Sequence, residues 1–324
     1  MDDPENQQTL AFAGAAQGLI LASSRAPFPT DDLSAVLNVE VFNPEGDATW
    51  PMLLFIHGIC ESAETWAVQR LARTCAENKW RLFVLELEGH GLSSGGRAVC
   101  GDFDRLRSHV DQFVRRCAGA PGETAPFALC GSSLGGVLAA YGSDGVSRRS
   151  RLGGGLEDLS QRFIGASLFA PAVGVSPEAV PPLLIVYLLR ILAFLAPSAG
   201  ILTPVEDPYH YACPETSTRN FCGRWPLSTS RMLLDVTSDT IRADQESGEL
   251  ALEIPALLVF AATEDTVVPL ESVQDFYSAA RAVDKKLIEV PGADHGLMFE
   301  EGTAVFVLAK LFGWLNSRTE SRRE

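Results

Sequence analysis

Short apolar runs alternate along the chain with longer segments of helical periodicity. Seven of the runs predict strands, and most of these are apolar without strict alternation, which is typical of strands buried on both faces of a sheet. These predicted strands are Leu37–Phe42, Met52–Ile56, Leu82–Leu87, Pro126–Cys130, Phe163–Phe169, Ala256–Phe260 and Lys286–Val290. The helices predicted among them are Thr65–Glu77, Phe103–Ala118, Leu134–Tyr141, Glu271–Ala282 and Ala304–Asn316. This order predicts an α/β fold with a mostly parallel sheet and helices on both of its faces.

The alternation fails between about residues 171 and 240, which we interpret as an insertion above the sheet. Its most apolar part is Leu183–Ala196, which lies between Pro182 and Pro197 and is interrupted by Arg190. A helix that crosses a membrane needs about 20 apolar residues, so this one is too short. It could cover an apolar cavity, lie on a membrane surface, or pack in the core.

These patterns divide the chain into four parts. We expect an N-terminal extension over residues 1–36, a core formed by 37–170 and 241–318, the insertion over 171–240, and a tail over 319–324. Within the core, the Gly-, Arg- and Ser-rich stretch Ser143–Gln161 predicts a surface loop. Another helix is expected near Ser228–Asp235 in the insertion.

Composition and charge narrow the function classes. Hydrophobic residues make up 46% of the chain, enough for a sizeable core. The net charge of −15 argues against a nucleic-acid-binding protein, because phosphate recognition needs a cationic face. The seven cysteines are odd in number and form no C-x-x-C pair, which favours reduced thiols and a cytoplasmic location. A local bridge between Cys213 and Cys222 stays open.

The sharpest chemical signal is the sequence Gly131-Ser132-Ser133-Leu134-Gly135, which follows a predicted strand and precedes a predicted helix. This is the G-x-S-x-G pattern in the strand–turn–helix context that presents a nucleophilic serine. The turn requires a strained backbone at Ser133, and the two glycines leave room where a Cβ would collide. Ser133 is therefore the candidate nucleophile.

A serine hydroxyl needs a base, and the chain has five histidines. His295 follows the last predicted strand, so its loop reaches the sheet edge that carries Ser133. His57 and His90 stand beside glycines after earlier strands and are expected to shape loops. His109 is expected on the surface of its helix, and His210 lies in the insertion without an obvious partner.

The third group should be a carboxylate between the serine and the histidine in sequence. Asp265 fits, because it follows the predicted strand Ala256–Phe260; Glu264 and Asp294 are the competitors. The oxyanion of the transition state also needs donors. We expect these to be the backbone N–H groups of Leu134, directly after the nucleophile, and of Ile59, after the glycine that follows His57.

Six segments in this order make the chain resemble an α/β-hydrolase, and specifically the monoacylglycerol lipase branch with its lysophospholipase and plant caffeoylshikimate-esterase relatives. They are FIHGICESAETW (55–66), LELEGHGLSSG (85–95), LCGSSLGG (129–136), FAPAVGVSP (169–177), VFAATEDTVVP (259–269) and PGADHGLMFE (291–300).

The resemblance implies the α/β-hydrolase fold, with a mostly parallel eight-strand sheet, helices on both faces and an inserted helical lid. It places the triad on Ser133, Asp265 and His295, and the oxyanion donors on Ile59 and Leu134. It also implies that the loop with Glu88 and His90 shapes a wall of the site. The chain departs from the branch at the elbow, which reads S-S-L instead of E-S-M, and in the polar half of the insertion, residues 205–225, which has no aligned counterpart.

The expected function is hydrolysis of a carboxylic ester with an apolar acyl chain through an acyl-enzyme on Ser133, with monoacylglycerol as the first substrate. Alternatives are a lysophospholipase, a phenolic-ester carboxylesterase, or a ligand-binding protein without turnover on the same fold. Transfer of the acyl group to an alcohol would use the same intermediate. The expected partner is a small lipid or ester, with membrane contact through the lid; no cofactor and no metal is implied.

Overall fold

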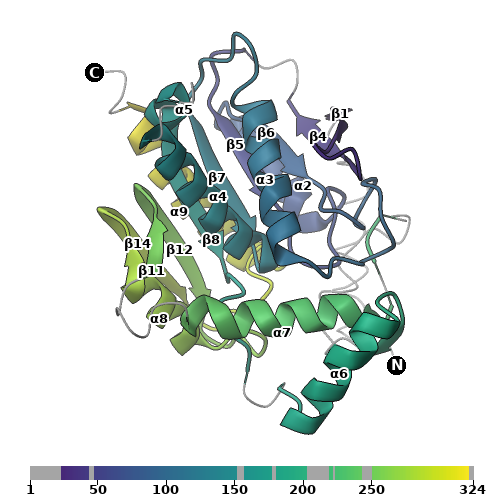
Figure 1. The fold of residues 1–324 in the computed structure, drawn as a ribbon. Helices are drawn as coiled ribbons and strands as arrows, with labels where there is room; N and C mark the ends of the chain where they lie inside the picture. The colour runs from purple at the N-terminus through teal and green to yellow at the C-terminus, as the bar shows by residue number, and fades with distance from the viewer. Residues whose placement is uncertain are drawn as a thin grey trace, which may run out of the picture.

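One sheet of eight strands organises the chain (Figure 1). The structure is a computed structural model, which describes residues 23–43, 47–151, 157–176, 180–202, 219–221, 223–242 and 250–320. The order of the strands is β1-β4-β6-β5-β7-β8-β12-β14. Their bounds are β1 (Ser23–Arg25), β4 (Val39–Phe42), β5 (Met52–Ile56), β6 (Arg81–Leu85), β7 (Phe127–Ser132), β8 (Phe163–Phe169), β12 (Ala256–Ala262) and β14 (Asp284–Val290).

The sheet is mostly parallel, as the sequence predicts. The six strands from β6 to β14 run parallel to their neighbours, while β4 is antiparallel to both β6 and β1. The exposed strand β1 has no apolar pattern that could have revealed it. The remaining short strands form three small sheets, which pair β2 (Phe28–Pro29) with β3 (Val36–Leu37), β9 (Gly200–Leu202) with β10 (Trp225–Pro226), and β11 (Leu250–Glu253) with β13 (Ala280–Arg281).

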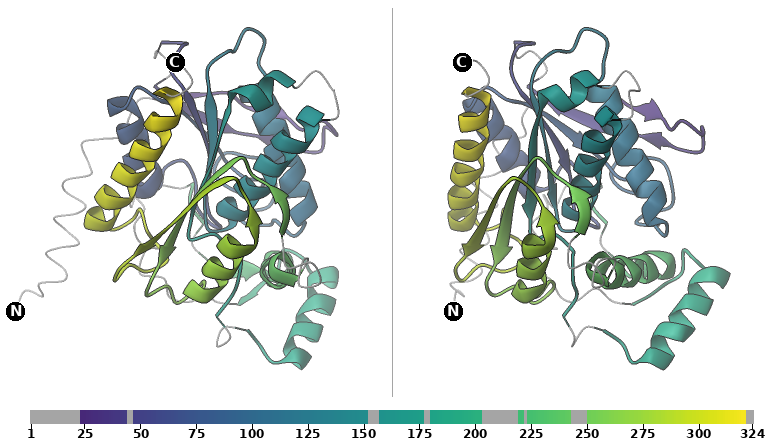
Figure 2. Two further views of the ribbon diagram at one scale, coloured as in Figure 1. Left: turned by 90° about the vertical axis from the view of Figure 1, so that its left-hand side faces the viewer. Right: turned by 60° about the vertical axis from the view of Figure 1, so that its left-hand side comes forward.

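Helices cover both faces of the sheet (Figure 2). On one face lie α3, α4 and α8, and on the other α2 and α9. The helices of the core are α2 (Trp66–Glu77), α3 (Phe103–Cys117), α4 (Leu134–Arg151), α5 (Glu157–Arg162), α8 (Leu270–Ala279) and α9 (Glu301–Glu320).

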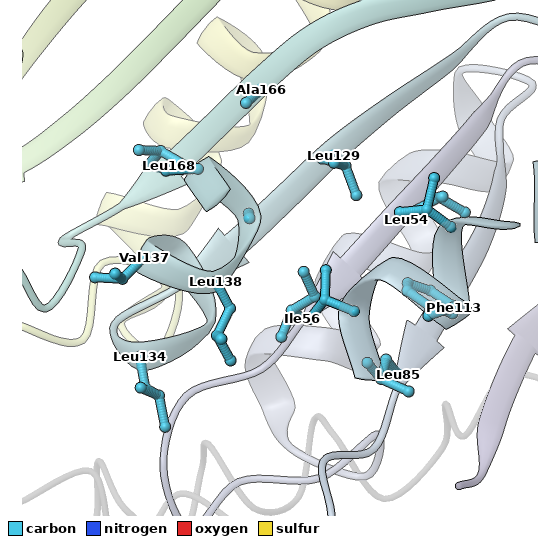
Figure 3. Packing of buried hydrophobic residues seen from close by; sticks show 14 of the residues in the cluster. Leu54, Ile56, Leu85, Phe113, Leu129, Leu134, Val137, Leu138, Ala166 and Leu168 are labelled. Atoms are coloured by element: carbon cyan, nitrogen blue, oxygen red, sulfur yellow. The ribbon is translucent and has the colours of Figure 1, made fainter. Parts of the chain in front are cut away.

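The two-sided burial of the strands explains their apolar runs. In β5, Leu54 and Ile56 join the core beneath α3 and α4, whereas Leu53 and Phe55 join the core beneath α2 and α9. Successive side chains of a strand point to opposite faces, so a strand covered twice must be apolar at every position. Figure 3 shows Leu54 and Ile56 in the first of these cores, together with residues of α3 and α4.

Two of the sequence predictions in this region are wrong. The predicted loop Ser143–Gln161 is in large part helical, because α4 continues to Arg151 and α5 follows. The hydroxyl of Ser143 donates to the carbonyl of Ala139 at 2.7 Å, so the serine is accommodated inside the helix. His109 is buried rather than exposed, because it lies on the inward face of α3 beside Leu106 and Val110.

The insertion between β8 and the last strands contributes α6 (Leu183–Leu195) and α7 (Leu227–Arg242), as the apolar pattern and the predicted helix near Ser228 indicate. In both views of Figure 2, α6 stands away from the sheet, and it packs against α7. Residues 171–176, 180–202, 219–221 and 223–240 of the insertion are described. His210, Cys213 and Cys222 lie outside the described residues, so the question of a bridge between the two cysteines stays open.

Candidate active site

Ser133 occupies a sharp turn between β7 and α4. Its φ angle is +52°, a left-handed conformation that is unfavourable for any residue with a side chain. A Cβ atom on Gly135 would lie 2.1 Å from the carbonyl oxygen of Ile56, and one on Gly131 would lie 2.1 Å from the carbonyl oxygen of Gly135. Both elbow glycines are therefore required by close backbone contacts, as the sequence predicts. The N–H of Ser133 donates to the carbonyl of Phe169 at 2.9 Å, and this hydrogen bond stabilises the strained conformation.

Asp265 and His295 form a hydrogen-bonded pair. Nδ1 of His295 lies 2.8 Å from Oδ2 of Asp265. The other carboxylate oxygen accepts the backbone N–H groups of Val267 and Val268, both at 2.8 Å. The Asp265 side chain is 2% exposed and that of His295 is 16% exposed. Because a carboxylate only accepts, Nδ1 of His295 carries the proton and Nε2 keeps the lone pair of a base.

The two competing carboxylates lie in surroundings that differ from those of Asp265. Asp294 accepts the backbone N–H of Gly296 at 3.0 Å, and Glu264 is exposed. The pairing observed for His295 is thus the one predicted with Asp265.

All three candidate residues follow parallel strands at one edge of the sheet. Ser133 follows β7, Asp265 follows β12 and His295 follows β14, which are separated in the sheet order only by β8. The carboxyl ends of parallel strands meet at one edge, where ligands of open α/β sheets bind. The topology therefore brings together residues that are up to 162 positions apart in the sequence.

The loop between β5 and α2, residues 57–65, lies directly against the elbow. A Cβ atom on Gly58 would be 3.3 Å from Cβ of Ser133. Ile59, the predicted oxyanion donor, is the next residue. Leu134 is the first residue of α4, so its N–H has no acceptor within the helix and lies at the positive end of the helix dipole. Leu134 thus directly follows the candidate nucleophile, and Ile59 follows the glycine that packs against it.

Two buried histidines shape this loop and its neighbour. Nδ1 of His57 lies 2.7 Å from the carbonyl oxygen of Gly58, and Nε2 accepts the N–H of Leu87 at 3.2 Å. The ring of His90 is 5.4 Å away, centroid to centroid. Burial lowers the pKa of His57 to about 3 and that of His90 to about 4, so both rings are neutral. They connect the loops after β5 and β6, in agreement with the loop-shaping role expected from the sequence.

Sequence reasoning missed a buried ionic cluster next to this loop. Glu86 is completely buried, and its carboxylate accepts the N–H groups of Ala63 at 3.1 Å and Leu92 at 2.7 Å. Arg219 of the insertion reaches the same cluster. The sequence held a signal for this cluster, because Glu86 is a charged residue within the apolar run Leu82–Leu87, which predicts a buried strand. A buried charge needs a partner.

The described residues hold no group of three or more His, Cys, Asp or Glu side chains that could bind a metal ion. Among the described helices, none combines the length and the hydrophobicity needed to cross a bilayer.

Comparisons with known proteins identify the family of the chain. A putative monoglyceride lipase of Schizosaccharomyces pombe is 26% identical over 271 residues, which span 81% of this chain and 66% of that protein, just under two thirds of its length. Caffeoylshikimate esterase of Arabidopsis thaliana is 21% identical over 272 residues, or 80% of this chain and 76% of that protein.

Among solved structures, a soluble variant of monoglyceride lipase from Saccharomyces cerevisiae, in complex with a substrate analog, superposes with a TM-score of 0.70 at 17% identity. The superposition covers 92% of this chain and 95% of that one, and it supports the fold. The family model described as serine aminopeptidase, S33 matches residues 49–302, which include the elbow, Asp265 and His295. The chain therefore has the α/β-hydrolase fold and belongs to the serine aminopeptidase S33 family.

Proposed function

We propose that the protein hydrolyses carboxylic esters through a covalent acyl-enzyme on Ser133. The observation that carries this proposal is the 2.8 Å contact between His295 and Asp265, at the sheet edge where Ser133 occupies a strained turn. A buried carboxylate that fixes the tautomer of a histidine is what a serine needs in order to act as a nucleophile.

The reaction proceeds in two halves. Nε2 of His295 takes the proton of the Ser133 hydroxyl while Oγ attacks the ester carbonyl carbon. The resulting imidazolium returns the proton to the leaving alcohol, and the acyl group stays on Ser133. Water then attacks the acyl-enzyme, its proton passes through His295 to Oγ of Ser133, and the carboxylic acid leaves. Asp265 stabilises the imidazolium in both halves.

The backbone N–H groups of Ile59 and Leu134 hold the negative charge of the carbonyl oxygen in both transition states. The position of Leu134 at the start of α4 and the contact of Gly58 with Ser133 support this assignment. Loss of one such donor typically slows an enzyme by about 10²–10³-fold.

The proposed substrate class is a monoacylglycerol, with lysophospholipids and phenolic esters as the alternatives. The apolar helix α6 favours a long acyl chain, and the two monoglyceride lipases among the relatives support that choice. The relative that is a caffeoylshikimate esterase supports the phenolic alternative.

We further propose that α6 belongs to a lid that meets a lipid surface. Its exposed apolar side chains include Leu183, Leu184, Tyr187 and Phe194, which are between 72% and 86% exposed. Its one charged side chain, Arg190, is paired with Asp235 of α7 at 2.5 Å. Large apolar side chains exposed together on one short helix typically mark a site of interaction with a membrane or a partner.

Sedimentation with phosphatidylcholine vesicles tests the lid proposal. We expect the double variant Leu184→Ser with Phe194→Ser to lose vesicle binding, and its rate on vesicle-embedded monoacylglycerol to fall more than its rate on water-soluble p-nitrophenyl butyrate. Equal vesicle binding by the variant and the wild type would contradict the lid proposal.

A cytoplasmic location is proposed on the state of the cysteines. Cys75, Cys100, Cys117 and Cys130 are free thiols, and burial raises the pKa of Cys100 to about 12. Unbridged cysteines are typical of a reducing compartment.

A substrate panel tests the proposed function. It comprises monoacylglycerols, a lysophospholipid, p-nitrophenyl butyrate and a phenolic ester, assayed with the wild type, Ser133→Ala and the neighbouring variant Ser132→Ala. We expect turnover by the wild type and by Ser132→Ala, and loss of turnover in Ser133→Ala. A wild type that binds these esters without releasing acid would instead favour a ligand-binding protein on the same fold.

A further inference from the structure

Three consecutive residues of the insertion run along the loop between β5 and α2. The N–H of Phe221 donates to the carbonyl of Cys60 at 3.0 Å. The hydroxyl of Ser62 donates to Oδ1 of Asn220 at 2.5 Å. The guanidinium of Arg219 lies 2.8 Å from the carboxylate of Glu64. We call Arg219, Asn220 and Phe221 the clamp; it follows the loop in antiparallel order, with a contact at every second loop residue.

Buried charge fixes the clamp to the core. Arg219 is 10% exposed and lies 3.1 Å from Glu40 of β4 and 3.8 Å from Glu86, whose side chains are 5% and 0% exposed. The other polar groups around these carboxylates are Arg25, Ser23 and Asn38, together with backbone N–H groups. Removal of Arg219 would leave buried carboxylates without their main cation, which is strongly unfavourable.

The loop that the clamp contacts is strained. Cys60 has a φ angle of +64°, a left-handed conformation in a residue with a side chain. Such a conformation persists only where the surroundings over-determine it. The carbonyl of Cys60 is the group that Phe221 holds, and Cys60 directly follows Ile59, the proposed oxyanion donor. The clamp therefore holds the peptide group that contains the carbonyl of Cys60. This group lies two peptide groups along the chain from the one that contains the N–H of Ile59.

We propose that the clamp is a positioning unit for the oxyanion site, in which Arg219 anchors the insertion so that the N–H of Ile59 faces the reacting carbonyl. This proposal rests on the proposed ester hydrolysis. It gives a role to part of the polar half of the insertion, which the family resemblance left without a counterpart. Arg219 acts through the loop and touches no substrate.

Substitution of two arginines of the insertion separates this role from general support of the fold. Arg219→Met removes the anchor. Arg231→Met is the matched control, because Arg231 also ties the insertion to the core, at the carbonyl of Gly101 at 2.6 Å, but far in sequence from the loop. With p-nitrophenyl butyrate, we expect Arg219→Met to lower kcat by about 10- to 100-fold and to leave KM within about twofold. This loss is smaller than the roughly 10²–10³-fold loss typical for removal of an oxyanion donor, because the N–H of Ile59 is displaced and not removed. Arg219→Lys, which keeps the charge, should recover part of kcat.

For Arg231→Met we expect kcat within about twofold of the wild type, as for a substitution outside the active site. Equal losses of kcat in Arg219→Met and Arg231→Met would overturn the proposal. So would a wild-type kcat in a folded Arg219→Met variant.

Milder variants keep the proposal testable if Arg219→Met does not fold. Asn220→Ala and Ser62→Ala each remove one partner of the bond between these two side chains, and Ser62→Ala also removes the acceptor of the N–H of Glu64, at 3.2 Å. If these two side chains affect kcat through the bond that they share, the double variant should be no slower than the slower single variant. Additive losses of kcat would contradict the clamp.

Hydrogen–deuterium exchange provides a readout that needs no turnover. Peptides covering residues 57–64 should exchange faster in Arg219→Met, or in Asn220→Ala, than in the wild type, and should be unchanged in Arg231→Met. If the wild type hydrolyses no ester but this exchange pattern appears, the proposed function fails while the clamp on the loop stands. Unchanged exchange in the clamp variants would overturn the clamp itself.

Discussion

Gly58 and Ser133 come from loops that follow different strands, yet a Cβ atom added to Gly58 would lie 3.3 Å from Cβ of Ser133. The same atom would lie 2.7 Å from the carboxylate of Glu61, which can swing away, whereas the strained backbone at Ser133 cannot. The loop that carries the proposed oxyanion donor is thus packed against the proposed nucleophile.

The first prediction concerns this contact. Gly58→Ala should displace the loop or the elbow by a few tenths of an ångström and lower kcat by about tenfold, less than the roughly 100-fold loss that a 1 Å misplacement can cause. Steady-state kinetics on p-nitrophenyl butyrate measure the effect. Gly302→Ala is the control, because a Cβ there meets nothing within 4 Å. An unchanged kcat in Gly58→Ala would show that the two loops are not in contact during the reaction.

The second prediction tests the orienting carboxylate. Asp265→Asn keeps an oxygen for the N–H groups of Val267 and Val268 but presents an amide to Nδ1 of His295, which favours the wrong tautomer. We expect kcat to fall by about 10³–10⁴-fold with little change in melting temperature. Asp294→Asn, at the adjacent competitor, should keep most of the activity. If Asp294→Asn instead lost its activity and Asp265→Asn kept it, Asp294 would be the third residue of the triad.

The strands and the elbow could be predicted from the sequence because each depends on a local pattern. The pairing of Asp265 with His295 follows from the order of the triad residues along the chain and from the family resemblance. Buried strands such as β5 and β12 are apolar at every position, and the elbow needs its glycines. His109 and the continuation of α4 could not be predicted in this way, because a polar residue on a buried helix face looks like any surface residue in sequence. The contacts of Arg219 depend on the path of the insertion through space, and no local pattern encodes that path.

The third prediction follows from the two neutral histidines. The folded protein lowers the pKa of His57 to about 3 and of His90 to about 4, below the ordinary value of 6.5, so the unfolded chain binds these protons at higher pH than the folded one. Stability is therefore fully present above about pH 6.5 and declines as the pH falls toward 4. Each histidine should remove about 1 kcal/mol from the free energy of unfolding between pH 6.5 and pH 5.5.

Urea denaturation at several pH values measures this decline. His90→Gln, whose side chain does not titrate, should show a smaller loss of stability over the same pH interval than the wild type. The same pH dependence in His90→Gln as in the wild type would mean that His90 is not neutral in the folded protein.

The most direct test of the central claim is peptide mapping by mass spectrometry after reaction with a fluorophosphonate, which modifies only an activated serine. We expect one adduct, on Ser133, formed rapidly by the wild type and by Ser132→Ala, and lost in His295→Ala, where the base is missing. An adduct on another residue, or labelling of Ser133 that is equally fast without His295, would contradict the assignment of Ser133 as a nucleophile activated by His295.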